Sequence, residues 1–177
     1  MNILFLNPPD INKVSESTVD EKAQEYIESD DFGAFPPLGL MYVMAYLEKH
    51  APHHKLYFKD CIAERYGHKD LSNYVAKIKP DIVAITSFTI SMIDVIIAAR
   101  NIRKIVPDAH LCLGGHHPIA FPFEAASLPE FDSIVVGEGE IVFAKLIKAI
   151  EEKKSFTEIV GIYTKESIQK YRNTTLK

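Results

Sequence analysis

The chain has 177 residues, of which 47% are hydrophobic, and it carries a formal net charge of −4. This length suits one domain with a sizeable core, and the slightly acidic balance excludes the general basic surface that nucleic-acid binding requires. The apolar stretches are too short for a membrane-spanning helix or a signal peptide, so we expect a cytoplasmic protein without a membrane span and without a nucleic-acid partner.

Short apolar runs alternate with helical stripes along the chain, starting with a strand at its amino end. The predicted strands cover residues 2–7, 55–60, 81–87, 110–115 and 132–138. The predicted helices between them cover residues 38–50, 68–79, 92–106, 121–128 and 140–153. This alternation indicates βαβ units, so we predict an α/β fold with a doubly wound, flavodoxin-like, five-stranded parallel sheet.

The two ends of this plan carry further predictions. Residues 158–172 have the pattern of a C-terminal hairpin, so we divide the chain into an α/β domain over 1–157 and a hairpin or linker over 158–177. Ser91 and Asp94 form an S-x-x-D signal that predicts a capped helix start. Cys61 and Cys112 lie in or beside strand-like runs, so we expect both to be free and buried in a reducing compartment.

A long acidic segment interrupts the pattern over residues 10–35. It contains eight acidic residues against two lysines, and it leaves the carboxyl end of the first predicted strand. Because ligands bind at the carboxyl edge of such sheets, the segment could be a lid over a binding site or a surface insertion.

The carboxyl ends of the predicted strands mark a candidate crevice. The residues that follow these strands are Asn7, Pro8, Pro9, Ser87, Phe88, Thr89, Gly114, Gly115, His116, His117, Gly137, Glu138 and Gly139. Small residues at three neighbouring strand ends leave room for a large or long-tailed ligand, although three ordinary strand–helix turns would give the same pattern.

Metal and phosphate sites are poorly supported by the motifs. His116 and His117 are adjacent, and the sequence has no H-E-x-x-H or C-x-x-C spacing, so we predict no dedicated zinc or iron site. The sequence also lacks a P-loop and a complete dinucleotide fingerprint, and Glu138 would repel a phosphate at the helix start that it precedes.

Several stretches together resemble a known family. In chain order they are NPP, FPPLGLMYVMAYLEKH, KPDIVAITSFT, LGGHHP, DSIVVGEGE and IVGIYTK. This order resembles the N-terminal cobalamin-binding domain of cobalamin-dependent radical S-adenosylmethionine enzymes, a group that includes methyltransferases and anaerobic magnesium-protoporphyrin IX monomethyl ester oxidative cyclases. The resemblance runs from about residue 2 to residue 165, and it implies cobalamin as the cofactor.

The resemblance also implies roles for the crevice residues. The nucleotide tail of cobalamin would pass Ser87, Phe88 and Thr89, and Gly114 and Gly115 would leave space for it. Gly137, Glu138 and Gly139 would lie at the rim, and Pro8 and Pro9 would lie under the corrin. His117 would order the loop or contact the ligand, with His116 at the variable position before it.

Two features depart from the family pattern. Many cobalamin domains place a histidine after the first strand as the lower cobalt ligand, whereas this chain reads NPPDINK there. The radical domain binds its iron–sulfur cluster through C-x-x-x-C-x-x-C, which is absent here. We therefore expect the chain to bind cobalamin without catalysing a reaction, with S-adenosylmethionine and the cluster in a further C-terminal domain.

Two other hypotheses stay open. The chain could be a cofactor-free α/β docking domain of the same type of enzyme, with its crevice filled by its own side chains. It could also act alone, with His116 or His117 as acid or base and Glu138 as partner, although no nucleophile stands beside them.

Overall fold

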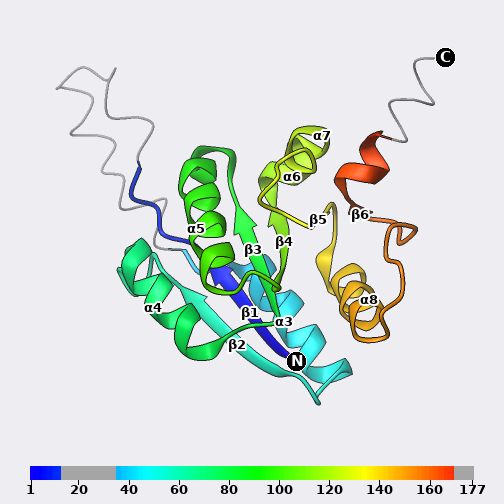
Figure 1. Ribbon diagram of the computed structural model, residues 1–177, viewed down its shortest axis with the longest axis horizontal. Helices are drawn as coiled ribbons and strands as arrows, with labels where there is room; N and C mark the ends of the chain where they lie inside the picture. The colour runs from blue at the N-terminus through cyan, green and yellow to red at the C-terminus, as the bar shows by residue number, and fades with distance from the viewer. Residues whose placement is uncertain (13–34, 170–177) are drawn as a thin grey trace.

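The computed structural model describes residues 1–12 and 35–169. These residues form a layered α/β fold in which helices cover both faces of one sheet (Figure 1). Most of the acidic segment over 10–35, for which a lid and a surface insertion are both open, lies outside the described residues.

The described residues contain one six-stranded sheet with the order β2-β1-β3-β4-β5-β6. Its strands are β1 (Asn2–Asn7), β2 (Lys55–Asp60), β3 (Ile82–Ser87), β4 (His110–Gly115), β5 (Ser133–Val135) and β6 (Ile162–Tyr163). The first five strands pair in parallel, and β6 pairs antiparallel with β5. Because the chain moves from β1 outward to β2 and then returns to β3, the strand order reverses between β1 and β3.

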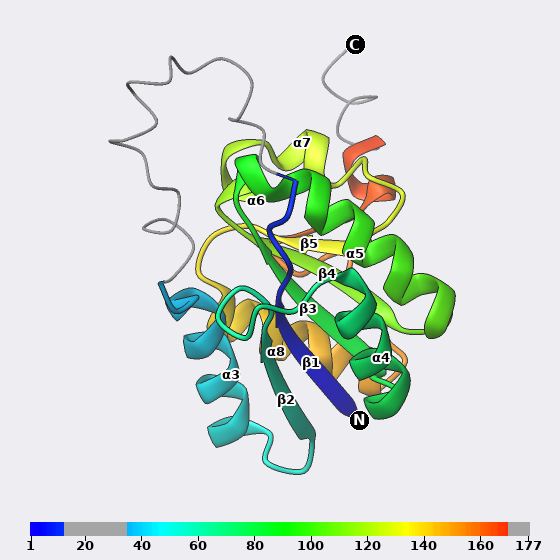
Figure 2. The ribbon, with the colours of Figure 1, turned by 90° about the vertical axis from the view of Figure 1, so that its left-hand side faces the viewer.

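Two pairs of helices enclose the sheet. The helical elements are α3 (Leu38–His50), α4 (His68–Ile78), η1 (Thr89–Ser91), α5 (Met92–Ile105), α6 (His116–Ala120), α7 (Pro122–Ala125) and α8 (Gly139–Glu151). In Figure 2 the strands lie between α3 on one side and α4 and α5 on the other. No helix among the described residues is both long enough and apolar enough to span a bilayer.

The sheet has a buried core on each face because successive side chains of a strand point in opposite directions. In β1, Leu4 and Leu6 belong to the cluster under α4 and α5, whereas Ile3 and Phe5 belong to the cluster under α3 and α8. All four side chains are fully buried, as expected for a strand that is covered on both faces. The doubly wound parallel sheet predicted from the sequence is confirmed.

Two details of the predicted elements need correction. The C-terminal segment does not form a hairpin of its own within the described residues. It supplies one short strand, β6, whose partner is β5, with Val136 N–H also donating to the carbonyl of Gly161 at 2.9 Å. The predicted helix over 121–128 is shorter than expected, since α7 ends at Ala125 and a separate turn of helix, α6, precedes it.

The predicted S-x-x-D cap is absent as well. Helix α5 follows Ser91, but the hydroxyl of Ser91 bonds the backbone of Phe88, accepting from its N–H at 3.2 Å and donating to its carbonyl at 3.1 Å. Asp94 is fully buried and bonds to other segments, which are described below. The S-x-x-D pattern therefore predicts the correct start of α5, although the side-chain cap on which the prediction rests does not form.

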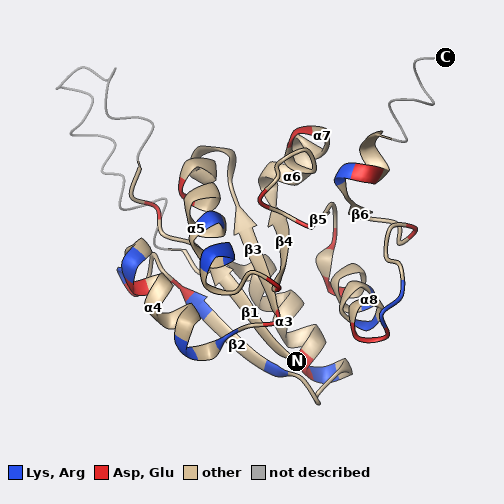
Figure 3. Cartoon of the chain, in the orientation of Figure 1, with Lys and Arg blue, Asp and Glu red and all other residues tan. Residues whose placement is uncertain are grey.

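Charged side chains of both signs are distributed over the surface helices. Figure 3 shows Lys and Arg interspersed with Asp and Glu along α4, α5 and α8. The charge on these three helices is therefore of mixed sign.

Candidate functional site

A large cavity opens at the carboxyl edge of the sheet, where the strand order reverses. Its volume is about 1220 Å³, and its lining includes Asn7 and Pro8 after β1 and Ser87 and Phe88 after β3. Open parallel sheets bind ligands in this crevice, because the connections on either side of the reversal point diverge to opposite faces. The fold therefore places most of the predicted crevice residues around one opening.

Nine of the twelve predicted binding residues line this cavity. They are Pro8, Ser87, Phe88, Gly114, Gly115, His116, Gly137, Glu138 and Gly139. The other three, Pro9, Thr89 and His117, are not among the lining residues. The structure thus assembles most of the predicted set at one place, and the contact of each residue with a ligand stays a prediction.

The inner part of the cavity lies between the sheet and helices α3 and α8. On the sheet side it is lined by Ala84, Cys112 and Gly114, three small residues on the same face of β3 and β4. On the helix side it is lined by Leu40, Val43 and Phe143. The cavity is therefore a slot that enters the apolar core, with polar groups confined mainly to its mouth.

These apolar walls were not predicted from the sequence, although one signal for them is present in it. Ala84, Thr86, Cys112 and Gly114 are small residues at alternating positions of two paired strands. Small side chains at these four positions leave space on one face of the sheet. Neighbouring positions of the sheet carry leucine and isoleucine. The helix residues Leu40, Val43 and Phe143 looked like ordinary core positions and gave no comparable signal.

The two glycines that end β4 have different structural roles. A Cβ atom added to Gly114 would have one neighbour within 4 Å, the carbonyl oxygen of Ile85 at 4.0 Å, so its missing side chain leaves cavity space. A Cβ on Gly115 would lie 2.6 Å from the backbone nitrogen and oxygen of Ser87, and Gly115 has φ +95°. Gly114 therefore leaves open space where a side chain would be and Gly115 allows a close backbone approach, and the contact of either glycine with a ligand stays a prediction.

The neighbouring histidines also differ in role. The imidazole of His116 lines the cavity and stacks on the ring of Phe88, with ring centroids 4.5 Å apart and an interplanar angle of 12°. His117 is buried, its Nδ1 lies 3.2 Å from the hydroxyl of Thr89, and its ring packs against Phe121. His117 therefore orders the loops after β3 and β4, and His116 is the histidine that a ligand in the cavity would meet.

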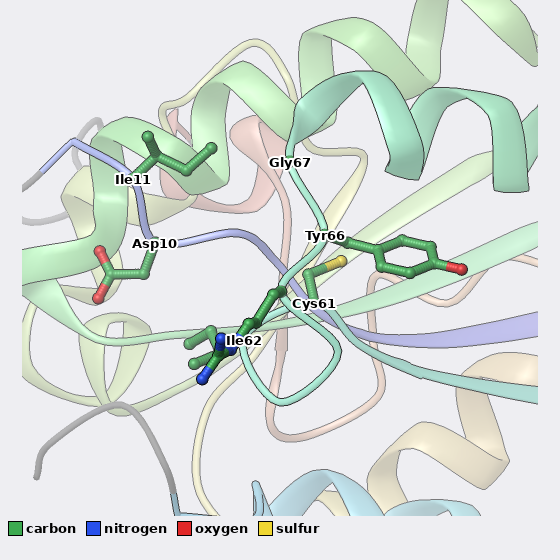
Figure 4. Close-up of a pocket in the computed structure, with 7 residues that line it drawn as sticks. Asp10, Ile11, Cys61, Ile62, Tyr66 and Gly67 are labelled. Atoms are coloured by element: carbon green, nitrogen blue, oxygen red, sulfur yellow. The ribbon is translucent and has the colours of Figure 1, made fainter. Parts of the chain in front are cut away.

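The end of β1 is held by a side-chain contact to β2. The side-chain amide of Asn7 donates to Oδ1 of Asp60 at 2.9 Å, and the same oxygen accepts the backbone N–H groups of Ile62 and Ala63. A smaller pocket of about 290 Å³ adjoins this corner and shares Asp10 and Ile62 with the large cavity. Figure 4 shows Cys61 and Ile62 on the loop after β2, with Asp10 and Ile11 on the segment after β1.

Comparison with known proteins identifies the family. Residues 32–147 match the B12 binding domain family. The chain belongs to that family. It is 32% identical over 133 residues to an uncharacterized methyltransferase of Pyrococcus horikoshii, covering 75% of this chain and 28% of that protein. It is 33% identical over 120 residues to the anaerobic magnesium-protoporphyrin IX monomethyl ester cyclase of Cereibacter sphaeroides, covering 67% of this chain and 19% of the cyclase.

A solved structure confirms the fold of this B12-binding domain. The radical S-adenosylmethionine methyltransferase TsrM from Kitasatospora setae, solved with cobalamin and a [4Fe-4S] cluster bound, superposes with a TM-score of 0.65 at 22% identity. The superposition covers 91% of this chain and 26% of that one. The chain thus spans about a fifth to a quarter of the length of the relatives that it matches.

A buried carboxylate fixes the segment that leaves β1 in this B12-binding domain. Oδ2 of Asp94 accepts the backbone N–H groups of Ile11 at 2.9 Å and Asn12 at 2.7 Å, and Oδ1 accepts from the side-chain amide of Asn12 at 2.8 Å. Nε2 of His68 lies 2.7 Å from Oδ1. Burial alone would raise the pKa of Asp94, but the hydrogen bonds from Asn12, His68 and Ile11 outweigh it and lower that pKa below 3.8.

The Asp94 contacts join three parts of the fold. Asp94 belongs to α5, His68 begins α4, and Ile11 and Asn12 continue from β1 past the cavity. Since all of these partners donate to one carboxylate, its ionised form is the form that the site stabilises. Sequence reasoning assigned Asp94 to a helix cap, because the partners that bury it are remote in sequence.

One thiol faces the cavity. Cys112 is buried on the cavity side of β4, and burial raises its pKa to about 12. Cys61 is also free and buried, with its pKa raised to about 12 by burial. Both thiols are therefore protonated near neutral pH, and Cys112 contributes a small apolar surface to the slot.

Proposed function

We propose that this chain binds cobalamin in the carboxyl-edge cavity and that its nucleotide tail enters the slot between the sheet and helices α3 and α8. The observation that carries the proposal is the cavity of about 1220 Å³, which is larger than most pockets for small ligands and continues into the core past Gly114. A slot lined by small and apolar residues suits a long, narrow extension of a ligand.

The residues of the cavity have distinct tasks in this proposal. Ser87 donates a hydrogen bond from its hydroxyl to the carbonyl of Gly114 at 2.9 Å, which fixes the rim beside the slot. Pro8 would contact the corrin, and the stacked rings of Phe88 and His116 would offer the ligand a flat surface. Gly137, Glu138 and Gly139 border the mouth on the side of β5.

The proposed division of labour is that the protein holds the cofactor and the cofactor supplies the chemistry. Bound cobalamin would carry a methyl group or take part in redox chemistry, as group-carrying cofactors do. The chain's own contribution is to bind and orient it and to exclude water from the slot. We assign no catalytic residue to this chain.

We further propose that this domain acts within a longer radical S-adenosylmethionine enzyme of the methyltransferase or oxidative cyclase type. The similarity at 32–33% identity to a methyltransferase and to an anaerobic cyclase, both much longer than this chain, supports that setting. A further C-terminal domain would hold S-adenosylmethionine and an iron–sulfur cluster. A cytoplasmic location fits the two free, buried thiols.

The alternative of a cofactor-free docking domain predicts a crevice filled by its own side chains. The described residues instead leave a large cavity, and the rings of Phe88 and His116 stack on one another at its border. For a free-standing acid–base site, only His116 and Glu138 of the proposed residues line the cavity, because His117 is turned into the loop contact with Thr89.

The test is direct binding. The purified chain is mixed with hydroxocobalamin, desalted by gel filtration and examined for the visible absorbance of the corrin. We expect the corrin to elute with the protein, and a parallel experiment with cobinamide, which lacks the nucleotide tail, to show weaker retention. Complete loss of corrin from the protein fraction would contradict the proposal, and equal retention of both compounds would reject the tail placement.

A further inference from the structure

A second cluster of potential ligands lies at the amino edge of the sheet, away from the cavity. His53 and His54 belong to the loop between α3 and β2, and Glu151 is the last residue of α8. Nε2 of His53 lies 3.1 Å from Oε1 of Glu151, and Nε2 of His54 lies 3.9 Å from Oε2. One carboxylate is therefore approached by two imidazole nitrogens.

The fold sets up this approach by packing α3 against α8. Helix α3 ends at His50, and the following turn is closed by the N–H of His54 donating to the carbonyl of Ala51 at 3.2 Å. This turn places the rings of His53 and His54 close together, with centroids 4.0 Å apart and planes tilted by 47°. The side chains of adjacent residues usually point in different directions. The turn is therefore needed for both imidazole rings to face Glu151.

The surroundings hold one ring firmly and leave the cluster accessible. The side chain of His54 is 1% exposed, and its Nδ1 lies 3.4 Å from the amino nitrogen of Met1. When Nε2 binds an ion, the ring proton is on Nδ1, and the amine of Met1 must be deprotonated to accept it. The side chains of His53 and Glu151 are 60% and 42% exposed. An ion from solvent can therefore reach the cluster, while His54 pays little conformational entropy to bind it.

We propose that His53, His54 and Glu151 bind a divalent zinc-type ion through the two Nε2 atoms and a carboxylate oxygen. The three ligand atoms all lie within 4.8 Å of one another. Zinc binds imidazole nitrogen and carboxylate oxygen at about 2.0–2.2 Å, which places tetrahedral ligands roughly 3.3–3.6 Å apart. The two Nε2 atoms lie 3.4 and 3.9 Å from the same oxygen, Oε2 of Glu151, so small side-chain rotations suffice to reach that geometry.

The ligand set also indicates the type of site. Two histidines and one glutamate with an exposed side leave a fourth position for water. His53 contacts Glu151 at hydrogen-bond distance, and Nε2 of the buried His54 faces the same carboxylate at 3.9 Å, which is within reach of an ion pair but too long for a hydrogen bond. A shared cation accounts for both approaches.

This site differs from the sequence-based expectation that the chain has no dedicated metal site. That expectation rested on local ligand spacing, whereas here His53 and Glu151 are 98 residues apart and meet only because α3 packs on α8. The ion would tie the loop after α3 to the end of α8. It would thereby brace the two helices that wall the cavity, and its binding is independent of the proposed cobalamin site.

The experiment is zinc titration of the tag-free chain after removal of metals with a chelator. Isothermal titration with zinc chloride should show one ion bound per chain, and cobalt(II) should give the strong visible absorption of a four-coordinate site with nitrogen and oxygen ligands. His53→Asn and Glu151→Gln should each weaken zinc binding by about tenfold or more, since even outer-sphere changes have effects of that size.

Neighbouring residues provide matched controls. His50→Asn changes an exposed histidine three positions before His53, and Glu152→Gln changes a carboxylate that pairs with Lys154 at 2.7 Å. Both control variants should bind zinc within about twofold of the unchanged chain. Absence of zinc binding would overturn the proposal, as would equal binding by Glu151→Gln or an equal loss in the control variants. His53 and Glu151 are exposed, so their replacement should leave folding intact, which thermal unfolding without zinc will verify.

Discussion

Gly115 meets the backbone of Ser87 so closely that a Cβ at residue 115 would lie 2.6 Å from both its nitrogen and its oxygen. The two residues are paired at the ends of β4 and β3, where Ser87 also donates its hydroxyl hydrogen to the carbonyl of Gly114. The rim of the cavity is therefore built from backbone-to-backbone contact. Gly115 forms the rim, so we expect its replacement to affect the stability of the fold. Gly114 leaves space beside the rim, so we expect its replacement to affect ligand binding.

Gly115→Ala should destabilise the protein. The added Cβ meets backbone atoms that cannot rotate away, and φ +95° is unfavourable for alanine, so we expect a loss of about 1–3 kcal/mol in the free energy of unfolding. Urea denaturation followed by circular dichroism measures it. Gly39→Ala is the control, because a Cβ there has no neighbour within 4 Å and alanine favours the helix. Equal midpoints for the two variants would show that the rim adapts.

Gly114→Val should leave the fold intact and weaken cobalamin binding. A Cβ at residue 114 meets only a carbonyl oxygen at 4.0 Å, and the slot beside it is open, so we expect the larger side chain to extend into the slot. We expect the dissociation constant of cobalamin to rise about tenfold, which corresponds to about 1.4 kcal/mol, with little change for cobinamide. Titration with both corrins measures the difference. A similar loss for both would place the tail elsewhere.

The layered fold could be predicted from the sequence because each helix and strand has its own pattern of hydrophobic residues. β1 and α3 have the predicted bounds, since an apolar run before Pro8 and a helical stripe after Pro37 need no distant partner to be recognised. The crevice followed from the fold, because ligands bind at carboxyl ends of parallel strands.

Features made by remote contacts could not be predicted in this way. Asp94 looked like a capping residue, and only the folded chain brings Ile11, Asn12 and His68 to its carboxylate. The strand β6 looked like half of a hairpin, because its two residues gave no indication that β5 was the partner. In both cases the local sequence pattern is present, but the structural role of the residues is determined by a tertiary contact.

Both cysteines should be unreactive in the folded protein. With pKa values raised to about 12 by burial, only about 10⁻⁴ of each thiol is ionised at pH 8, and Cys61 and Cys112 are 1% and 2% exposed. We expect Ellman's reagent to label neither thiol over the time in which it labels both in urea. Fast labelling of one thiol without denaturant would show that its region opens, and the labelled position can be identified by mass spectrometry.

Asp94→Asn should destabilise the protein by about 2–4 kcal/mol near neutral pH. The amide cannot accept from all four donors, and its own N–H groups would face them, so buried donors are left without an acceptor. Asp108→Asn is the control, because Asp108 is exposed on the turn after α5. A loss of similar size in the control would mean that removal of one negative charge, rather than loss of these hydrogen bonds, causes the effect.

The pH dependence of this difference tests the same carboxylate. The pKa of Asp94 in the folded protein is lowered below its ordinary value of 3.8, so the ionised form contributes stability above pH 3.8. That contribution is lost as the pH falls from 3.8 through the lower pKa of the folded state. The stability difference between the unchanged chain and Asp94→Asn should therefore be constant above this range and shrink below it. Urea unfolding across acidic pH measures both proteins, and a difference that stays constant down to the acid limit would show that Asp94 is not held in its ionised form.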